Sequence, residues 1–309
     1  FFQAEDGIRD AQESRGLGDV YKRQVIDNDL ENLISSLVFL NQVGLKPVIL
    51  HGAGPMLSKA LEEQKIDFSF IDGQRVTSVE VRDVACSVFG ETNKKIVNSL
   101  EAQGANAKGV TSNVFECIMD NADLGYVGSI QSVNYQLINE ILESDSIPVI
   151  APIGFQDDEK LNINADIATV ELVKAINPYK AIFLSDTGGI FNQRGQLIPN
   201  INLALEYDEL MQQEWLHSGM KLKLEQIKSL LDFLPKTASV SITEPINLPK
   251  ELFTDSGSGT LIKHGYSVVQ HQLPEKDIQE QFRNIIEKSF SGKLVDNFFD
   301  NPNDLDIFM

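Results

Sequence analysis

The chain has 309 residues, of which 42% are hydrophobic and 23% are charged, as in ordinary globular proteins. Its formal net charge of −19 argues against nucleic acid as a partner, because binding to phosphate backbones needs clustered lysine and arginine. The cysteines Cys86 and Cys117 have neither the spacing of a disulfide framework nor that of metal ligands, so we expect a reducing compartment. No apolar run approaches the roughly 20 residues that cross a bilayer, so no membrane partner is expected.

Residues 1–24 follow neither a helical nor a strand pattern. Their apolar residues have no period, and the turn formers Gly7, Gly16 and Gly18 fall irregularly. The stretches QAEDGIRD and SRGLGDVYKRQ resemble in-frame translations of sequencing-adapter DNA, and a disordered leader or transit peptide is the alternative. We therefore expect this segment to be non-native and exclude it from the fold prediction. Any natural targeting signal would then be missing.

From Val25 onward, helical and strand patterns alternate. Asn28 or Asp29 can cap a first helix that ends near Gly44. Short apolar runs predict buried parallel strands at Pro47–His51, Ile147–Ala151 and Ala181–Ser185. Amphipathic spacing predicts helices that start at Pro55 and that span Ala165–Ile176 and Met220–Leu234. The alternation predicts an α/β fold, with an open, mainly parallel sheet sandwiched between helices over residues 25–270. Residues 271–309 are predicted to lie outside this fold, with a separate helix-like segment that opens at Pro274.

The first candidate binding segment is His51–Pro55 (HGAGP), between a predicted strand and a predicted helix. Small residues there let the backbone N–H groups of Gly52 and Ala53 approach an anion, which the helix dipole also favours. A plain tight turn explains the pattern equally well.

The second segment is Leu161–Asp166 (LNINAD), which leads into a helix. Asn162, Asn164 and Asp166 could organise an anionic substrate and polar catalytic groups. The alternative is structural, with Asn164 as the helix cap and Asp166 favourably placed in the first turn.

Two further segments carry glycine or lysine beside a predicted element. Ser185–Ile190 (SDTGGI) lies at the carboxyl end of an apolar strand, where open α/β sheets bind ligands, although a hairpin near Asn192–Gly195 competes. Ser218–Lys223 (SGMKLK) places lysines at a helix start, where the dipole disfavours cations, which makes a phosphate-facing role for one of them plausible. A solvated surface lysine is the alternative.

Arg75, in GQRVT, is the fifth candidate. A single arginine after a turn suits a bidentate contact with a carboxylate, and an exposed arginine without such a role is the alternative.

The order of these segments resembles that of the acetylglutamate kinases, members of the amino-acid kinase family, from Val25 to about Tyr266. The stretches EYDELMQQEW, KLKLEQIKSLLDFLP, SVSIT and KELFTDSGSGTLIKHG are similar to the branch that combines acetylglutamate synthase and kinase. Residues Phe282–Phe299 resemble the opening of that branch's acetyltransferase-type domain.

The resemblance implies phosphoryl transfer from ATP, with Mg²⁺, to the side-chain carboxylate of N-acetyl-L-glutamate in arginine biosynthesis. It implies that Lys223 stabilises the transferring phosphoryl group and that Asp166 holds the catalytic lysines. It also implies that the substrate is bound by Gly52, Ala53, Arg75, Asn162 and Asn164. The nucleotide would lie along Asp186, Thr187, Gly188, Gly189, Ile190, Phe191, Gly219 and Met220. No protein-bound metal is expected beyond the Mg²⁺ that bridges the phosphates.

The resemblance also implies regulation and leaves alternatives. Glu251 and Gly259 resemble the segment that binds arginine in arginine-inhibited members, although a last strand and turn explain them equally well. The family uses a lysine at the end of its first strand, which would lie upstream of Val25. The resemblance begins only at Val25, so this strand and its lysine are expected to be missing. We therefore expect weak or no kinase activity from this chain. An acetylglutamate synthase, another carboxylate kinase and a non-catalytic amino-acid-binding module are the alternatives. A dimer or tetramer is expected, in bacterial cytoplasm or a mitochondrial matrix.

Overall fold

The computed structural model consists of two compact units, Phe1–His264 and Gly265–Met309, which are described separately. The described residues are 2–4, 19–178, 180–185, 187–216, 218–254, 257–265, 270–271, 280, 283–284, 287 and 307–308. The predicted boundary after residue 270 thus lies six residues beyond the division that the contacts define.

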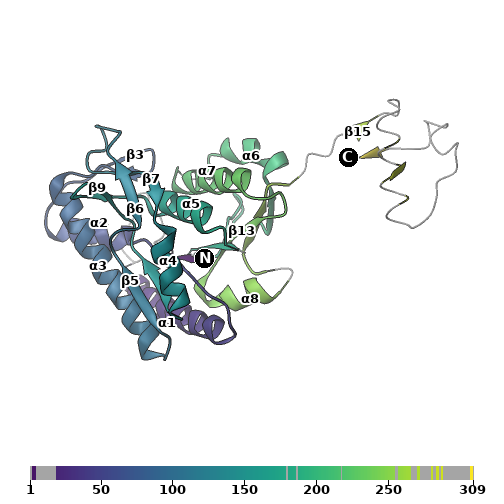
Figure 1. Cartoon of the computed structure of the whole chain (residues 1–309). Coiled ribbons are helices and arrows are strands. Elements are labelled where there is room, and N and C mark those ends of the chain that lie inside the picture. Colours follow the sequence, from purple (N-terminus) through teal and green to yellow (C-terminus); the bar gives the residue numbers. More distant parts are fainter. Residues whose placement is uncertain are drawn as a thin grey trace. The chain divides into compact units, whose positions relative to one another are not determined.

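An eight-stranded, mainly parallel sheet forms the centre of the first unit (Figure 1). Its strand order is β12-β14-β13-β11-β1-β2-β8-β5, and only β13 and β14 run antiparallel to each other. The strands are β1 (Phe2–Ala4), β2 (Ile49–His51), β5 (Ala107–Val110), β8 (Ile147–Ile150), β11 (Ala181–Leu184), β12 (Asn200–Asn202), β13 (Ser239–Thr243) and β14 (Thr260–Lys263). The predicted strands at 47–51, 147–151 and 181–185 are therefore confirmed, each slightly shorter than expected.

Helices cover both faces of this sheet, because successive side chains of a buried strand point to opposite sides. Leu50 and Phe183 pack in the cluster that contains α5 and α7, whereas Ile49 and Ile182 pack in the cluster that contains α1 and α3 (Figure 1). The helices are α1 (Asp19–Gln42), α2 (Gly54–Glu63), α3 (Val79–Ala102), α4 (Tyr135–Glu143), α5 (Ala165–Ile176), α6 (Leu203–Met211), α7 (Ser218–Phe233), α8 (Leu248–Phe253) and the 3₁₀ helix η1 (Pro245–Asn247). The predicted three-layer α/β fold is confirmed.

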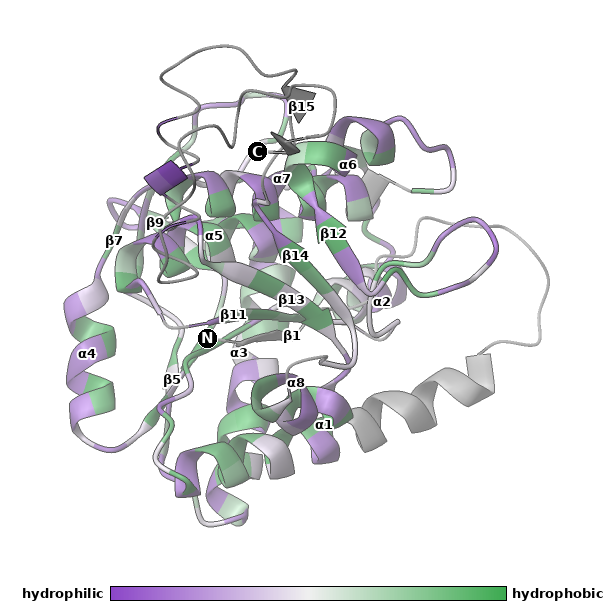
Figure 2. Ribbon diagram, turned by 90° about the vertical axis from the view of Figure 1, so that its right-hand side faces the viewer, coloured by the Kyte–Doolittle hydropathy of each residue, from purple (hydrophilic) through white to green (hydrophobic). Residues whose placement is uncertain are grey.

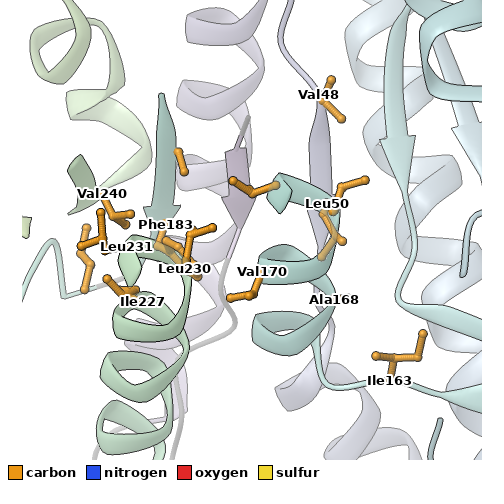
Figure 3. Close-up of a cluster of buried hydrophobic side chains, with 14 of the residues drawn as sticks. Val48, Leu50, Ile163, Ala168, Val170, Phe183, Ile227, Leu230, Leu231 and Val240 are labelled. Carbon is orange, nitrogen blue, oxygen red and sulfur yellow. The ribbon is translucent and has the colours of Figure 1, made fainter. Parts of the chain in front are cut away.

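The larger cluster of buried side chains joins the sheet to α5 and α7. Figure 3 shows Val170 of α5 and Ile227 and Leu230 of α7 facing Phe183 and Leu50 of the strands. Figure 2 shows hydrophobic colour concentrated on β11, β13 and β14 and hydrophilic colour along one side of α4. Burying these apolar side chains stabilises the packing of α5 and α7 against the sheet.

A smaller sheet and a hairpin lie beside the main sheet. The sheet has the order β10-β9-β6-β7, and its strands are β6 (Phe115–Ile118), β7 (Ser129–Val133), β9 (Ile153–Gln156) and β10 (Glu159–Asn162). The hairpin joins β3 (Phe70–Ile71) to β4 (Gln74–Arg75) through Asp72 and Gly73, both of which have positive φ. These elements carry Arg75 and Asn162 and were not predicted as strands.

The amino-terminal segment differs from the prediction in two ways. The sequence predicted neither strand nor helix in residues 1–24, yet β1 is a strand paired in parallel with β2 and β11. An empty position would leave the backbone N–H and C=O groups of both neighbouring strands unpaired, and an extended segment can pair with them whatever its side chains. In addition, α1 begins at Asp19 rather than at Asn28 or Asp29, since neither glycine nor proline interrupts residues 19–42. The adapter origin of residues 1–24 stays a prediction.

The second unit contains a short antiparallel pair, β15 (Gln270–His271) and β16 (Ile307–Phe308). Arg283 and Glu287 form an ion pair of 3.6 Å. Most of the predicted start of an acetyltransferase-type domain, residues 282–299, lies outside the described residues. Among the helices that the structure describes, none combines the length and the apolar character that crossing a membrane would require.

Candidate active site

The centre of the candidate site is a buried ion pair between α7 and α5. Lys223 Nζ donates to Asp166 Oδ1 at 2.6 Å, and Lys223 is fully buried. The ammonium also lies over the Phe183 ring of β11, 4.8 Å from its centroid. A lysine that is charged and fully buried needs such partners, because burial without them would neutralise it. The alternative of a solvated lysine at this position is thus excluded.

Asn164 and Asp166 have different roles, since Asn164 caps α5 and Asp166 pairs with Lys223. Asn164 Oδ1 accepts from the backbone N–H groups of Asp166 and Ile167, so Asn164 is the predicted N-cap of α5. Asp166 lies in the first turn and is directed at Lys223. Capping therefore holds the carboxylate in place, and it uses the oxygen of Asn164.

Arg75 is buried at the end of the β3–β4 hairpin, so the alternative of an exposed arginine is excluded. Its Nη2 donates to the Gly54 carbonyl at 3.3 Å and to Ser58 Oγ at 2.8 Å. Its guanidinium carbon lies 4.5 Å and 4.6 Å from the ring centroids of Phe68 and Phe70. Burial lowers the pKa of Arg75 to about 10, so the group stays charged at neutral pH.

One end of the Arg75 guanidinium has no partner within the part of the chain that the structure describes. Nη1 is buried, and no described residue accepts a hydrogen bond from it. An unsatisfied, charged donor costs free energy in the folded protein. An anionic ligand that accepts from Nη1 would remove that cost, and a carboxylate has the geometry for it.

The glycine turn at His51–Pro55 contacts the β3–β4 hairpin, and the hairpin lies against α7. Gly52 and Ala53 follow β2, and Ala53, which precedes α2, has no side chain that could cap it. Gly73 of the hairpin lies against Leu222 of α7, where a Cβ on Gly73 would be 3.0 Å from Leu222 Cδ2. The contacts of Arg75 with Gly54 and of Lys223 with Asp166 complete the connection. The first, second, fourth and fifth predicted segments therefore lie together.

The predicted nucleotide loop follows β11 and is held by β14. Thr187 Oγ1 lies 2.9 Å from Ser185 Oγ and donates to the Gly189 carbonyl at 3.1 Å. Thr260 Oγ1 accepts from the Ile190 N–H at 2.8 Å. Gly188 has a φ of +72°, and a Cβ there would meet Glu244 Cγ at 2.8 Å, so this position needs glycine.

The other residues predicted to bind the nucleotide are Asp186, Phe191, Gly219 and Met220. Asp186 lies outside the described residues. Phe191 is 39% exposed and forms an antiparallel bridge with Leu197, so the hairpin predicted near Asn192–Gly195 follows the loop. Gly219 is in the first turn of α7, and Met220 packs against the main core.

The predicted regulatory residues lie in a separate cavity. About 220 Å³ in volume, it is lined by Lys180, Thr237, Ser239, Glu251, Thr254, Gly257, Gly259, Leu261 and Lys263. Glu251 Oε1 is 3.3 Å from Lys180 Nζ, and Glu251 Oε2 accepts from the Ser258 N–H at 2.9 Å. Burial alone would raise the pKa of Glu251, but nearby Ser241, the Ser258 N–H and Lys180 outweigh it and hold that pKa below its ordinary value.

Some residues of these sites were not predicted from the sequence. Ser58, Phe68 and Phe70 contact Arg75, and Lys180 contacts Glu251. Their roles depend on contacts between distant parts of the chain, for which a single sequence carries no signal. Among the described residues, no group of at least three His, Cys, Asp or Glu side chains could hold a metal ion.

The sequence matches a known family over most of this unit. Residues 18–232 match the amino acid kinase family, which is more than half of the chain. This chain is an amino acid kinase family member. It is 46% identical over 279 residues to the acetylglutamate kinase of Xanthomonas campestris pv. campestris, covering 90% of this chain and 66% of that kinase. The chain thus spans just under two thirds of the length of that relative.

A mitochondrial relative and a solved structure extend the comparison of this family member. Protein arg-6, mitochondrial, of Neurospora crassa is 43% identical over 243 residues, 78% of this chain and 28% of that protein. The structure of N-acetylglutamate synthase from Neisseria gonorrhoeae has a TM-score of 0.73 at 21% identity, covering 87% of this chain and 64% of that chain. At this identity the structural likeness shows the fold alone.

Proposed function

We propose that this chain is the kinase domain of an acetylglutamate kinase, which transfers phosphate from ATP to the side-chain carboxylate of N-acetyl-L-glutamate. The observation that carries the proposal is the buried Lys223–Asp166 pair at the meeting point of the predicted binding segments. The 46% identity to an acetylglutamate kinase supports the choice of substrate.

Phosphoryl transfer depends mainly on positioning and on neutralising charge. The Lys223 ammonium would stabilise the charge on the transferring phosphoryl group, an effect that is strongest in a site from which water is excluded. Asp166 would keep this ammonium charged and orient it through their 2.6 Å contact. Neither residue would form a covalent intermediate.

Arg75 would bind a substrate carboxylate through its buried Nη1, which no described residue engages. The two aromatic rings and Ser58 hold the guanidinium in one orientation, so little side-chain entropy would be lost on binding. The Asn162 amide would contact the substrate amide, and Asn164 would contribute only its nitrogen. Backbone N–H groups at Gly52 and Ala53 would face the reacting carboxylate.

The nucleotide would lie along the loop from Asp186 to Phe191 and beside Gly219 and Met220. In that position its phosphates would approach the first turn of α7, which carries a partial positive charge. Mg²⁺ would enter this site with the ATP phosphates, whose oxygens are the ligands that this ion prefers. When bound, the ion would neutralise charge on those phosphates.

An ATP-dependent acyl-phosphate assay, with the product trapped as the hydroxamate, tests this function. We would measure it on this chain and on a version in which residues 1–24 are replaced by a first strand that ends in the lysine implied by the family resemblance. Hydroxamate formed from N-acetyl-L-glutamate and lost in Lys223→Ala supports the proposal. Absence of product from both proteins, with intact folding, would overturn it.

The cavity beside Glu251 is proposed to bind L-arginine. Its lining combines the Glu251 carboxylate with small residues such as Gly257 and Gly259, and a Cβ on Gly259 would lie 2.7 Å from the Gly188 carbonyl oxygen of the nucleotide loop. Arginine is therefore expected to raise the melting temperature and lower kinase activity, and Glu251→Gln to abolish both effects. Arginine that changes neither property of the chain would remove this role.

The family resemblance also supports proposals for the assembly and the cellular compartment. We propose a homodimer or homotetramer, and light scattering on the purified chain measures the mass of the assembly. The cytoplasm is proposed for a bacterial source and the mitochondrial matrix for a eukaryotic one, since the relatives include bacterial and mitochondrial proteins. Fractionation of the source cells distinguishes the two.

A further inference from the structure

Thr77 lies between the two side chains proposed to bind the substrate, Arg75 and Asn162. It is fully buried, two residues after Arg75. Its Oγ1 is 2.8 Å from the Arg75 carbonyl oxygen and 3.1 Å from Asn162 Nδ2. Asn162, at the end of β10, is only 8% exposed. None of the roles proposed above uses the Thr77 hydroxyl.

The polarity of these two hydrogen bonds fixes the orientation of the Asn162 amide. A carbonyl oxygen only accepts, so the single hydroxyl proton of Thr77 is donated to the Arg75 carbonyl. Toward Asn162 the hydroxyl can then only accept, and Asn162 must present its NH₂ group to it. The two ends of a side-chain amide can usually exchange by rotation, but here the exchange would set two acceptors against each other. Asn162 Oδ1 is therefore directed away from Thr77.

The backbone, rather than the hydroxyl, holds Thr77 and Asn162 at this separation. On one side, the Thr77 N–H donates to the Leu124 carbonyl and the Tyr126 N–H donates to the Thr77 carbonyl, both at 2.8 Å. On the other, the Asn162 N–H donates to the Tyr126 carbonyl and the Gly128 N–H donates to the Asn162 carbonyl, both at 2.9 Å. Removing the hydroxyl should leave this ladder intact and release only the rotation of the amide.

We propose that Thr77 is a positioning residue that holds the Asn162 amide with its oxygen toward the substrate, so that the site selects a ligand with an N–H donor. The inference deepens the proposed function and rests on it. The matching substrate group is the secondary amide N–H of an N-acylated amino acid. A ligand with an ester oxygen at that position would face the amide oxygen with a second acceptor, and the site would reject it.

The test compares two ligands that differ only at this atom, N-acetyl-L-glutamate and 2-acetoxyglutarate, the ester analogue. Their dissociation constants are measured by isothermal titration calorimetry on the full chain and on Thr77→Val, which keeps the shape of the side chain without its hydroxyl. We expect the wild type to prefer the amide by at least roughly tenfold. We expect Thr77→Val to bind the amide about tenfold more weakly and to lose most of this preference, because the released amide can offer NH₂ to the ester.

Two further variants separate positioning from a structural role. Thr77→Ser retains the hydroxyl and should restore both the affinity and the preference. Thr169→Val is the matched control, since Thr169 is equally buried but its hydroxyl donates to the Ala165 carbonyl of its own helix. This control should keep the wild-type preference, and Thr77→Ala repeats the test if the valine variant does not fold.

The outcomes distinguish this inference from the proposed function. A wild type that prefers the amide, beside a Thr77→Val variant with the same preference, would overturn the inference and leave the kinase proposal standing. Equal loss of both ligands, or no restoration by Thr77→Ser, would also overturn it. A wild type that does not bind N-acetyl-L-glutamate would overturn the proposed function, and this inference with it.

Discussion

Lys223 and Asp166 are 57 positions apart in the sequence and form a 2.6 Å contact in the core, with almost no exposure of either side chain. The pair joins the first turn of α5 to α7. Breaking a buried pair leaves one charge without compensation, whereas replacing both partners removes the charge altogether. Stability and activity should therefore respond differently to the same substitutions.

The pair can be tested with Lys223→Met, Asp166→Leu and the double variant. Each single variant should lose about 3–5 kcal/mol of unfolding free energy, and the double variant should lose much less than the sum. Activity should fall by at least about 10²-fold in all three, because the phosphoryl group loses its cation. Urea denaturation measures stability, and the hydroxamate assay measures activity in the version with the replaced first strand. A double variant as unstable as the sum of the singles would show that the residues are not energetically coupled.

The buried His51 makes stability depend on pH. Its Nε2 lies 3.1 Å from Asn93 Nδ2 and its Nδ1 lies 3.3 Å from the Gly52 carbonyl, so the neutral ring donates through Nδ1. Burial lowers the pKa of His51 from 6.5 to about 4, an effect that the hydrogen bond to Gly52 partly opposes. Between these values the unfolded chain binds a proton that the folded chain does not.

The stabilisation associated with neutral His51 is therefore complete above about pH 6.5 and falls as the pH drops toward 4. The loss should reach roughly 3 kcal/mol at pH 4. His51→Gln keeps an acceptor for Asn93 and has no titrating group, so its unfolding free energy should lack this component. Denaturation of both proteins from pH 7 to pH 4 measures the difference between the two curves. Parallel curves would contradict the assigned burial of a neutral histidine.

The fold could be predicted from the sequence where short-range patterns determine it. The apolar runs before His51, Ala151 and Ser185 became strands, because buried parallel strands need side chains that are apolar on both faces. The bounds of α5 were also predicted, since Asn164 is a strong cap. By contrast, β1 depends on pairing partners, which a local pattern does not contain. The early start of α1 was missed because residues 19–24 have no apolar period, although neither glycine nor proline interrupts the helix there.

The order of the segments along the chain predicted the candidate site, but it did not predict the contacts between its residues. Arg75, Asn162 and Lys223 each carried a modest signal of their own, and their specific roles came from the resemblance. Thr77 was part of the same segment as Arg75, but its bond to Asn162 joins residues 85 positions apart. Hydrogen bonds over such separations are set by the packed backbone and leave no periodic signal in one sequence.

Arg75 should lower the stability of the free protein and strengthen the binding of N-acetyl-L-glutamate. Its desolvated guanidinium, with Nη1 engaged by no described residue, costs free energy that a ligand would recover. Arg75→Met keeps the length of the side chain between the two aromatic rings and removes the charge. Its unfolding free energy should stay within about 1 kcal/mol of the wild type, while binding of N-acetyl-L-glutamate should weaken by at least about 10²-fold.

Calorimetric titration and urea denaturation on Arg75→Met and Arg75→Lys measure both properties. The lysine variant keeps a charge without the planar fork, so it should also bind weakly. The Michaelis constant for ATP should not change in either variant. Loss of stability well beyond about 1 kcal/mol without the ligand would mean that Arg75 is mainly a structural residue.

Substitution by alanine should destabilise the protein at Gly259 and stabilise it at Gly90. A Cβ on Gly259 would overlap the Ile242 carbonyl oxygen and lie 2.7 Å from the Gly188 carbonyl oxygen, so β13 and β14 would have to separate beside the nucleotide loop. Gly90 lies inside α3, and a methyl group added there would meet no atom within 4 Å outside its own helix turn. Gly259→Ala should lose about 1–3 kcal/mol and raise the Michaelis constant for ATP. Gly90→Ala should gain about 0.5–1 kcal/mol from helix propensity and leave that constant unchanged. Thermal denaturation and steady-state kinetics measure both, and a Gly259→Ala variant with wild-type stability would contradict the close approach of the two strands.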